Sequence, residues 1–170
     1  MKKTVKTSEI LSIFNVLSNA KYGKMEDADK IKVWKITRAL KPVAEKFDED
    51  TKDAAEKMKP TEDFDERLSK AQQYERAQQQ QKPTDDIMRM EDYENFIKDF
   101  KEYQKLINDA VKDFAEKEVE IDFEPLNEES FGKLMASNEW DMKQTMTVGD
   151  IIVEDVPAAK PEKERKKEGQ

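Results

Sequence analysis

A long run of apolar side chains spaced three or four residues apart constrains this fold more than any other feature. Between residues 93 and 114 the apolar positions return with the period of an α-helix and cover an arc of about 140° on its surface. They are Tyr93, Phe96, Ile97, Phe100, Tyr103, Ile107, Ala110, Val111 and Phe114. Some 25 helical residues at about 1.5 Å each make a rod of roughly 37 Å, whose aromatic-rich face needs a neighbouring element.

Three other stretches show the helical period. Apolar residues at 10–17, at 33–47 and at 64–74 predict two longer helices and one short one. Pro42 should kink the second of these, because proline lacks the amide hydrogen and clashes with the preceding turn. The charged segment that follows, up to Pro60, is only weakly helical in pattern. Residues 78–83 hold no apolar side chain and predict an exposed loop at the tip of a hairpin, with a binding loop as the alternative.

After the long helix the period changes from 3.6 to 2. Residues 118–123 alternate strictly between acidic and apolar side chains, and Pro125 ends the run, as expected of a half-buried strand. A lone strand leaves its backbone polar groups unsatisfied, so it needs a partner. The other strand-like segment is at residues 2–7, and we predict that the two pair.

These patterns predict a mainly α protein with a minor β element. A long helical hairpin plus short helices is closed by a two-stranded sheet made from the N-terminal segment and residues 118–123. We expect a single helical domain over residues 1–155. It includes a small C-terminal subdomain at about 126–155, in which Asn127 caps one helix and Thr147 with Asp150 caps the last. Residues 156–170 hold eight charged side chains and no apolar face, which predicts a disordered charged tail.

The composition excludes many kinds of chemistry. The chain has 170 residues, 41% of them charged, a formal net charge of −8, and neither histidine nor cysteine. Zinc fingers, disulfides, thiol nucleophiles and Ser/His/Asp triads are therefore impossible. Four scattered glycines make no phosphate-binding loop, and no apolar run is long enough to cross a membrane. We expect no enzymatic activity, no cofactor, no small-molecule substrate and no membrane association, and a cytoplasmic protein.

Two acidic clusters are candidates for a cation site. Glu118, Glu120 and Asp122 share one face of the predicted strand, but a strand spreads its ligands nearly 7 Å apart, whereas calcium loops make their ligands converge. A solvated acidic face is the preferred interpretation, with a metal or a basic partner as alternatives. The acidic run from Asp48 to Asp53 lacks the central glycine of a calcium loop and is interpreted as a solvated helix end or loop. We therefore predict no metal site.

The two tryptophans mark candidate partner-binding surfaces. Trp34 lies about 130° from the centre of its helix stripe, beside Ile31 and among basic residues that include Arg38 and Lys41. It is either covered by a neighbouring helix, such as that at 10–17, or part of a docking surface. Direct nucleic-acid binding is disfavoured by the net charge of −8. Trp140, among several methionines, either packs in the core or belongs to an adaptable docking surface.

The layout resembles a group of small helical proteins encoded by tailed phages and prophages, of unknown function and found among structural and tail genes. The resemblance rests on packing and charge positions within 9–17, 30–47 and 64–76 and on the acidic strand after the long helix. It implies a role in the virion or in its assembly. Its implied partners are other phage structural proteins or further copies of the chain, and its location is the host cytoplasm during assembly or the virion.

Two functional hypotheses of different classes follow. The first is a non-enzymatic phage structural or assembly protein that acts by protein–protein binding. The second is a small acidic inhibitor that imitates DNA or occupies a basic host protein. It is suggested by the net charge of −10 that remains for residues 1–155 once the basic tail is set aside. The inhibitor hypothesis predicts that the acidic side chains cluster on one face, and interspersed lysines and arginines would count against it.

Overall fold

The computed structural model describes residues 1–154, and the predicted tail at 156–170 lies outside the described residues. The elements in chain order are β1 (Lys2–Lys6), α1 (Thr7–Ser18), α2 (Asp27–Lys57), α3 (Phe64–Gln79), α4 (Met90–Glu116), β2 (Glu118–Asp122), α5 (Glu128–Ala136) and α6 (Met142–Ile152). The prediction of a mainly α protein with one small sheet is confirmed.

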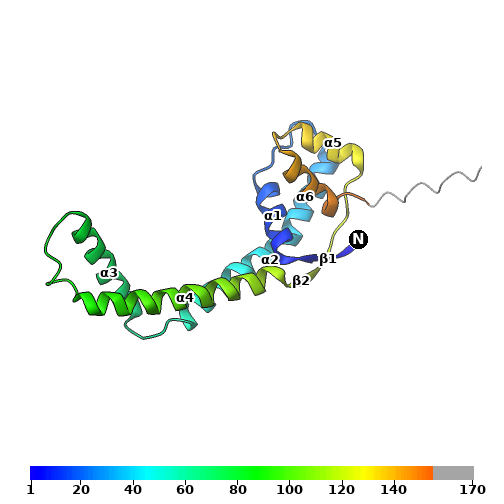
Figure 1. Ribbon diagram of the computed structural model, residues 1–170. Helices are drawn as coiled ribbons and strands as arrows, with labels where there is room; N and C mark the ends of the chain where they lie inside the picture. The colour runs from blue at the N-terminus through cyan, green and yellow to red at the C-terminus, as the bar shows by residue number, and fades with distance from the viewer. Residues whose placement is uncertain (155–170) are drawn as a thin grey trace, which may run out of the picture.

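The molecule has two regions (Figure 1). The head comprises β1, α1, the N-terminal half of α2, β2, α5 and α6. The arm comprises α2 from Glu45 onward, α3 and α4, with α2 and α4 packed side by side and α3 folded back along the start of α4. The long hairpin predicted from the apolar stripes is therefore the pair α2 and α4.

The two strands pair antiparallel, as predicted, and close the head. Lys2 lies opposite Asp122, and Lys6 lies opposite Glu118. The ladder continues into α1, because the Thr7 amide donates to the Lys117 carbonyl at 2.8 Å. The pairing joins the N-terminus to the end of α4, 110 residues away along the chain.

The head encloses the main hydrophobic core. Fifteen buried residues form one cluster that draws on α1, α2, both strands, α5 and α6. The C-terminal helices therefore pack on the same core as α1 and α2. Asn127 caps α5 by accepting a hydrogen bond from the Ser130 amide, as predicted. The predicted cap of the last helix is wrong: Asp141 caps α6 through a capping box with Gln144, and Thr147 lies inside the helix.

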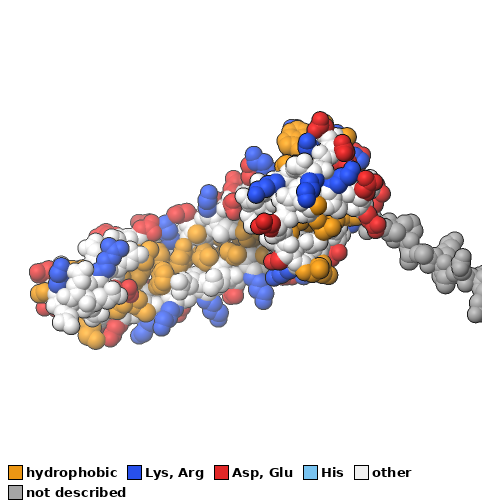
Figure 2. All heavy atoms as spheres, turned by 90° about the horizontal axis from the view of Figure 1, so that it is seen from above, with side chains coloured by type: hydrophobic (Ala, Val, Ile, Leu, Met, Phe, Trp, Pro, Cys, Tyr) orange, Lys and Arg blue, Asp and Glu red, His pale blue; other side chains and the backbone are white. Residues whose placement is uncertain are grey.

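The arm is more thinly packed. A second cluster at its tip consists of Phe64, Ala71 and Phe96. Within α4, Phe96 is the single buried residue, and the rest of the predicted stripe is only half-buried. Seen from above, hydrophobic side chains form a stripe along the arm between the head and α3 (Figure 2). The helix was predicted, and its aromatic-rich face does meet neighbouring helices, but most of that face is only half-buried because the arm supplies too few neighbours to cover it.

Helix α2 continues through Pro42 as a single element from Asp27 to Lys57. The segment after residue 48, predicted to be weakly helical, completes the same helix. It is held against α4 by the Tyr103 hydroxyl, which donates to the Ala55 carbonyl at 2.9 Å. After α3, helix α4 begins at Met90, with Arg89 at the N-cap position.

Candidate functional site

The outer face of α2 leaves two large apolar side chains in solvent. The inner face buries Val33, Ile36 and Leu40 completely. On the opposite side, Trp34 is 57% exposed and Ile31 is 53% exposed. Tryptophan side chains are highly buried on average, so a tryptophan that is more than half exposed marks a candidate contact surface.

A groove runs beside Trp34, between the end of α1 and the outer face of α2. Its volume is about 560 Å³. It is lined by Phe14, Leu17, Ser18, Tyr22, Trp34, Thr37, Arg38 and Lys41. Helix α1 thus borders the Trp34 ring and leaves more than half of it exposed, so the alternative in which that helix covers it is wrong.

Cationic groups border the aromatic ring. The Arg38 guanidinium lies 5.3 Å from the centroid of the Trp34 ring, in a cation–π contact that holds the two side chains together. Lys41 pairs with Glu45 one turn further along, at 3.4 Å. Within residues 1–154, Arg38 has no acidic partner, so its charge is available to a ligand.

The groove wall on the α1 side is neutral. The Tyr22 hydroxyl donates to the Leu17 carbonyl at 3.1 Å. A phenol is already protonated at neutral pH, and burial raises the pKa of Tyr22 further. The groove therefore combines an apolar wall with a basic rim. It suits a partner that presents apolar and acidic side chains together.

The charges of α2 divide sharply at Pro42. Residues 30–41 carry five basic side chains and no acidic one, whereas residues 45–56 carry six acidic and two basic side chains. The acidic half has its own shallow depression of about 320 Å³, lined by Glu45, Asp48, Glu49, Lys52 and Asp53. The sequence interpretation treated the acidic run from Asp48 to Asp53 as a solvated helix end or loop, and the run lies within α2. The change from basic to acidic side chains can be seen in the sequence. It defines two halves of one face because a single helix continues through Pro42.

Trp140 lies apart from this surface. It is half-buried and packs against the head core, and it does not line the Trp34 groove. Of the predicted partner-binding residues, Ile31, Trp34, Arg38 and Lys41 share the outer face of α2, and Trp140 does not join them.

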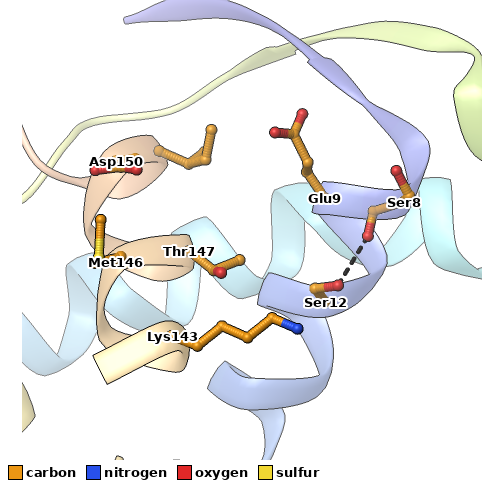
Figure 3. Close-up of a pocket in the computed structure, with 8 residues that line it drawn as sticks. Ser8, Glu9, Ser12, Lys143, Met146, Thr147 and Asp150 are labelled. Carbon is orange, nitrogen blue, oxygen red and sulfur yellow. Dashed lines mark hydrogen bonds between the residues drawn. The ribbon is translucent and has the colours of Figure 1, made fainter. Parts of the chain in front are cut away.

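Two other depressions flank the head. One of about 410 Å³ lies between α1 and α6, where Lys143 points toward α1 (Figure 3). The Ser12 hydroxyl, which lines this depression, donates a hydrogen bond to the Ser8 carbonyl at 3.0 Å, so Ser12 is not paired with a base. The other, of about 320 Å³, lies at the base of the arm, where Val43 and Phe47 of α2 face Phe114 of α4.

Two of the three carboxylates of β2 pair with cationic groups of the N-terminal segment. Lys2 pairs with Glu120 at 2.9 Å, and the N-terminal amine lies 3.3 Å from Asp122. Within the described residues, no group of acidic side chains is arranged to hold a metal ion. The strand therefore presents a mixed charged face and not a row of free ligands.

No family model, curated protein or solved structure matches this chain. Within residues 1–154, none of the helices combines the length and the apolar character that crossing a membrane requires.

Proposed function

We propose that this chain is a non-enzymatic phage structural or assembly protein that acts by binding other proteins through exposed helix faces. The observation that carries the proposal is the Trp34 surface: a tryptophan left 57% exposed, held by Arg38 and set beside a groove. Exposed Trp and Arg residues are the types that dominate the binding energy of protein interfaces. The phage setting, in the host cytoplasm during assembly or in the virion, comes from the sequence resemblance alone.

A non-enzymatic role is supported by the missing side chains. Without histidine or cysteine, a general base near neutral pH would have to be a carboxylate or a lysine with a strongly shifted pKa. The depression between α1 and α6 brings Ser8, Ser12 and Lys143 to one place, but the Ser12 hydroxyl donates to the Ser8 backbone carbonyl. A binding role therefore accounts for the described surface with fewer assumptions.

The acidic-inhibitor hypothesis is disfavoured by the arrangement of charge. Ion pairs intersperse the two signs along the surface, as in Lys46 with Asp50 and Lys70 with Glu66. Figure 2 likewise shows acidic and basic side chains mixed along both edges of the arm. A DNA mimic requires acidic groups spaced like phosphates on one face, and the acidic half of α2 adjoins a basic half.

Affinity purification from phage-producing cells tests the proposal. The tagged full chain is expected to retain virion proteins identified by mass spectrometry. The variant Trp34→Ser is expected to capture at least about tenfold less of them, which corresponds to a loss of about 1.4 kcal/mol of binding free energy. Met142→Ser is the matched control, because Met142 is an exposed apolar residue of the head, at 72% exposure, away from the groove. Equal capture by Trp34→Ser and wild type, or absence of virion proteins from both, would contradict the proposal.

A further inference from the structure

The outer face of α2 is exposed along its whole length. Each of its positions from one end to the other is open to solvent: Ile31, Trp34, Lys35, Arg38, Lys41, Glu45, Asp48, Glu49, Lys52, Asp53 and Glu56. At about 1.5 Å per residue this face is some 40 Å long. Such a length is enough for two helices to pack along one another.

The charges on this face are complementary to those on the same face of a second α2 helix that runs in the opposite direction. The N-terminal half is basic with an apolar anchor, and the C-terminal half is acidic with a shallow depression. When a second copy runs antiparallel, the basic half of each helix meets the acidic half of the other. A two-fold interface of this kind uses the same patch on both subunits, so every favourable contact occurs twice.

The spacing places the axis at the level of Val43. Arg38 lies five residues before Val43 and Asp48 five residues after it, about 7.5 Å in each direction. A two-fold axis there brings Arg38 level with the partner's Asp48. By the same count, Lys41 meets the partner's Glu45, and Lys30 meets the partner's Glu56.

The same axis accounts for the exposed tryptophan. Trp34 comes level with the partner's Lys52, which lines the shallow acidic depression. Its ring would pack on the aliphatic stem and ammonium group of that lysine, one turn from Asp48, which comes level with Arg38. The dimer thus gives a role to three features that the monomer leaves unexplained. They are the exposed Trp34, the Arg38 without an acidic partner and the depression among carboxylates.

We propose that the Trp34 surface binds a second copy of this chain, with two α2 helices antiparallel about a two-fold axis at Val43. The inference rests on the proposed protein-binding function and names the occupant of its surface. Virion proteins then contact the dimer through its remaining faces, and Trp34 contributes to their capture by holding the dimer together.

Light scattering after size-exclusion chromatography of the full chain gives the first test. The wild type is expected at twice the 19.9 kDa chain mass in low salt and to dissociate toward monomer as salt rises, because the interface is rich in charge pairs. A wild type that is monomeric in low salt at all accessible concentrations overturns the inference.

A charge-swap experiment tests the antiparallel geometry. The double variant Arg38→Glu with Lys41→Glu places acidic side chains level with the partner's Asp48 and Glu45. The double variant Glu45→Lys with Asp48→Lys places basic side chains level with the partner's Arg38 and Lys41. Each alone is expected to dimerise at least about 100-fold more weakly than wild type, because like charges face each other. Mixing the two is expected to restore a dimer that contains one chain of each, since opposite charges then meet in both halves.

Controls separate this outcome from general charge effects and misfolding. Lys98→Glu with Lys105→Glu changes the net charge by the same amount on exposed positions of α4 and should leave dimerisation unchanged. Circular dichroism checks that each variant keeps its helices. The inference is overturned if either double variant, correctly folded, remains dimeric on its own, or if the mixture of the two stays monomeric. If a monomeric chain captures virion proteins, the dimer is excluded and the proposed function still holds. If the chain is a dimer but captures no virion proteins, the proposed function is excluded and the dimer still holds.

Discussion

The head and the arm share helix α2 but differ in how completely they bury their apolar side chains. In the head, α2 places Val33, Ile36 and Leu40 at 0% exposure within a cluster of fifteen buried residues. In the arm, the tip cluster has three buried residues among those the structure describes. The arm is nevertheless the region with the strongest apolar periodicity in the sequence.

The difference shows that periodicity sets which face a helix turns inward, whereas the number of neighbours sets how much of it is buried. The head surrounds α2 with α1, the sheet and the C-terminal helices, while α4 has α2, α3 and α1 as its neighbouring helices and keeps one buried residue. The arm tip compensates with ring contacts around Phe64, whose centroid lies 5.5 Å from that of Phe96 and 4.8 Å from that of Tyr103. We therefore expect the head to set global stability and the arm to unfold locally.

The largest effect is expected from a cavity in the head. Leu40→Ala should lower the free energy of unfolding by about 2–5 kcal/mol, because it removes buried methylene groups and leaves a void. Urea denaturation followed by circular dichroism measures this loss. Leu106→Ala makes the same chemical change at a position of α4 that is 52% exposed and should cost less than about 1 kcal/mol. Equal losses would remove the distinction between the two regions.

A smaller effect in the head is expected from one buried hydrogen bond. The Ser130 hydroxyl, 5% exposed, donates to the Asp29 carboxylate at 2.7 Å and ties α5 to the first turn of α2. Ser130→Ala should cost about 1–2 kcal/mol, at the lower end for a bond to a charged group because Asp29 is partly solvated. The control Ser12→Ala removes an exposed hydroxyl of α1 and should be nearly neutral by the same denaturation assay. A neutral Ser130→Ala would indicate that α5 is held by its apolar contacts alone.

Sequence patterns predicted the elements better than their packing. The strand at 118–123 and its partner followed from strict alternation and from the need to satisfy backbone groups, and Asn127 was identified as a cap from local chemistry. The cap of α6 was misplaced because Thr147 with Asp150 resembles a capping box as closely as Asp141 with Gln144 does. Only the packing of the head chooses between them.

The candidate site shows the same limit. The position of Trp34 off the apolar stripe was evident from the spacing, but whether a neighbour covered the ring depended on where α1 ends against α2. The charge division of α2 was also present in the sequence. It became a surface feature only once residues 48–57 proved to extend the helix through Pro42.

In the arm, removal of its central ring should have a local effect. Phe64, 1% exposed, contacts the rings of Phe96, Phe100 and Tyr103. Phe64→Ala should therefore release α3 from α4 and speed amide hydrogen exchange in both helices, while exchange in the head stays slow. We expect global unfolding to shift by less than about 1 kcal/mol, because the head core is untouched. Head amides that exchange as fast as those of α3 would mean that the two regions unfold as one unit.

The smallest effect is expected from a single hydrogen bond on the arm at high pH. The Tyr93 hydroxyl donates to the Glu75 carboxylate at 2.7 Å, joining α4 to α3, and this bond, together with partial burial, raises the pKa of Tyr93 to about 12. An unfolded tyrosine titrates near pH 10, so the bond contributes its full stability below about pH 10 and loses it as the pH rises through about 12. Its contribution should be under about 1 kcal/mol, because Glu75 is exposed to solvent.

Phenolate absorbance against pH measures this ionisation directly. Tyr93→Phe should remove the titration step near pH 12, and Glu75→Gln should move that step down toward pH 10, because the carboxylate that disfavours the phenolate is gone. Tyr22→Phe, in the head, should keep the Tyr93 step and is the control. A step that stays near pH 12 in Glu75→Gln would show that burial and not the hydrogen bond governs Tyr93. The arm tip would then be packed more like the head than its small buried cluster indicates.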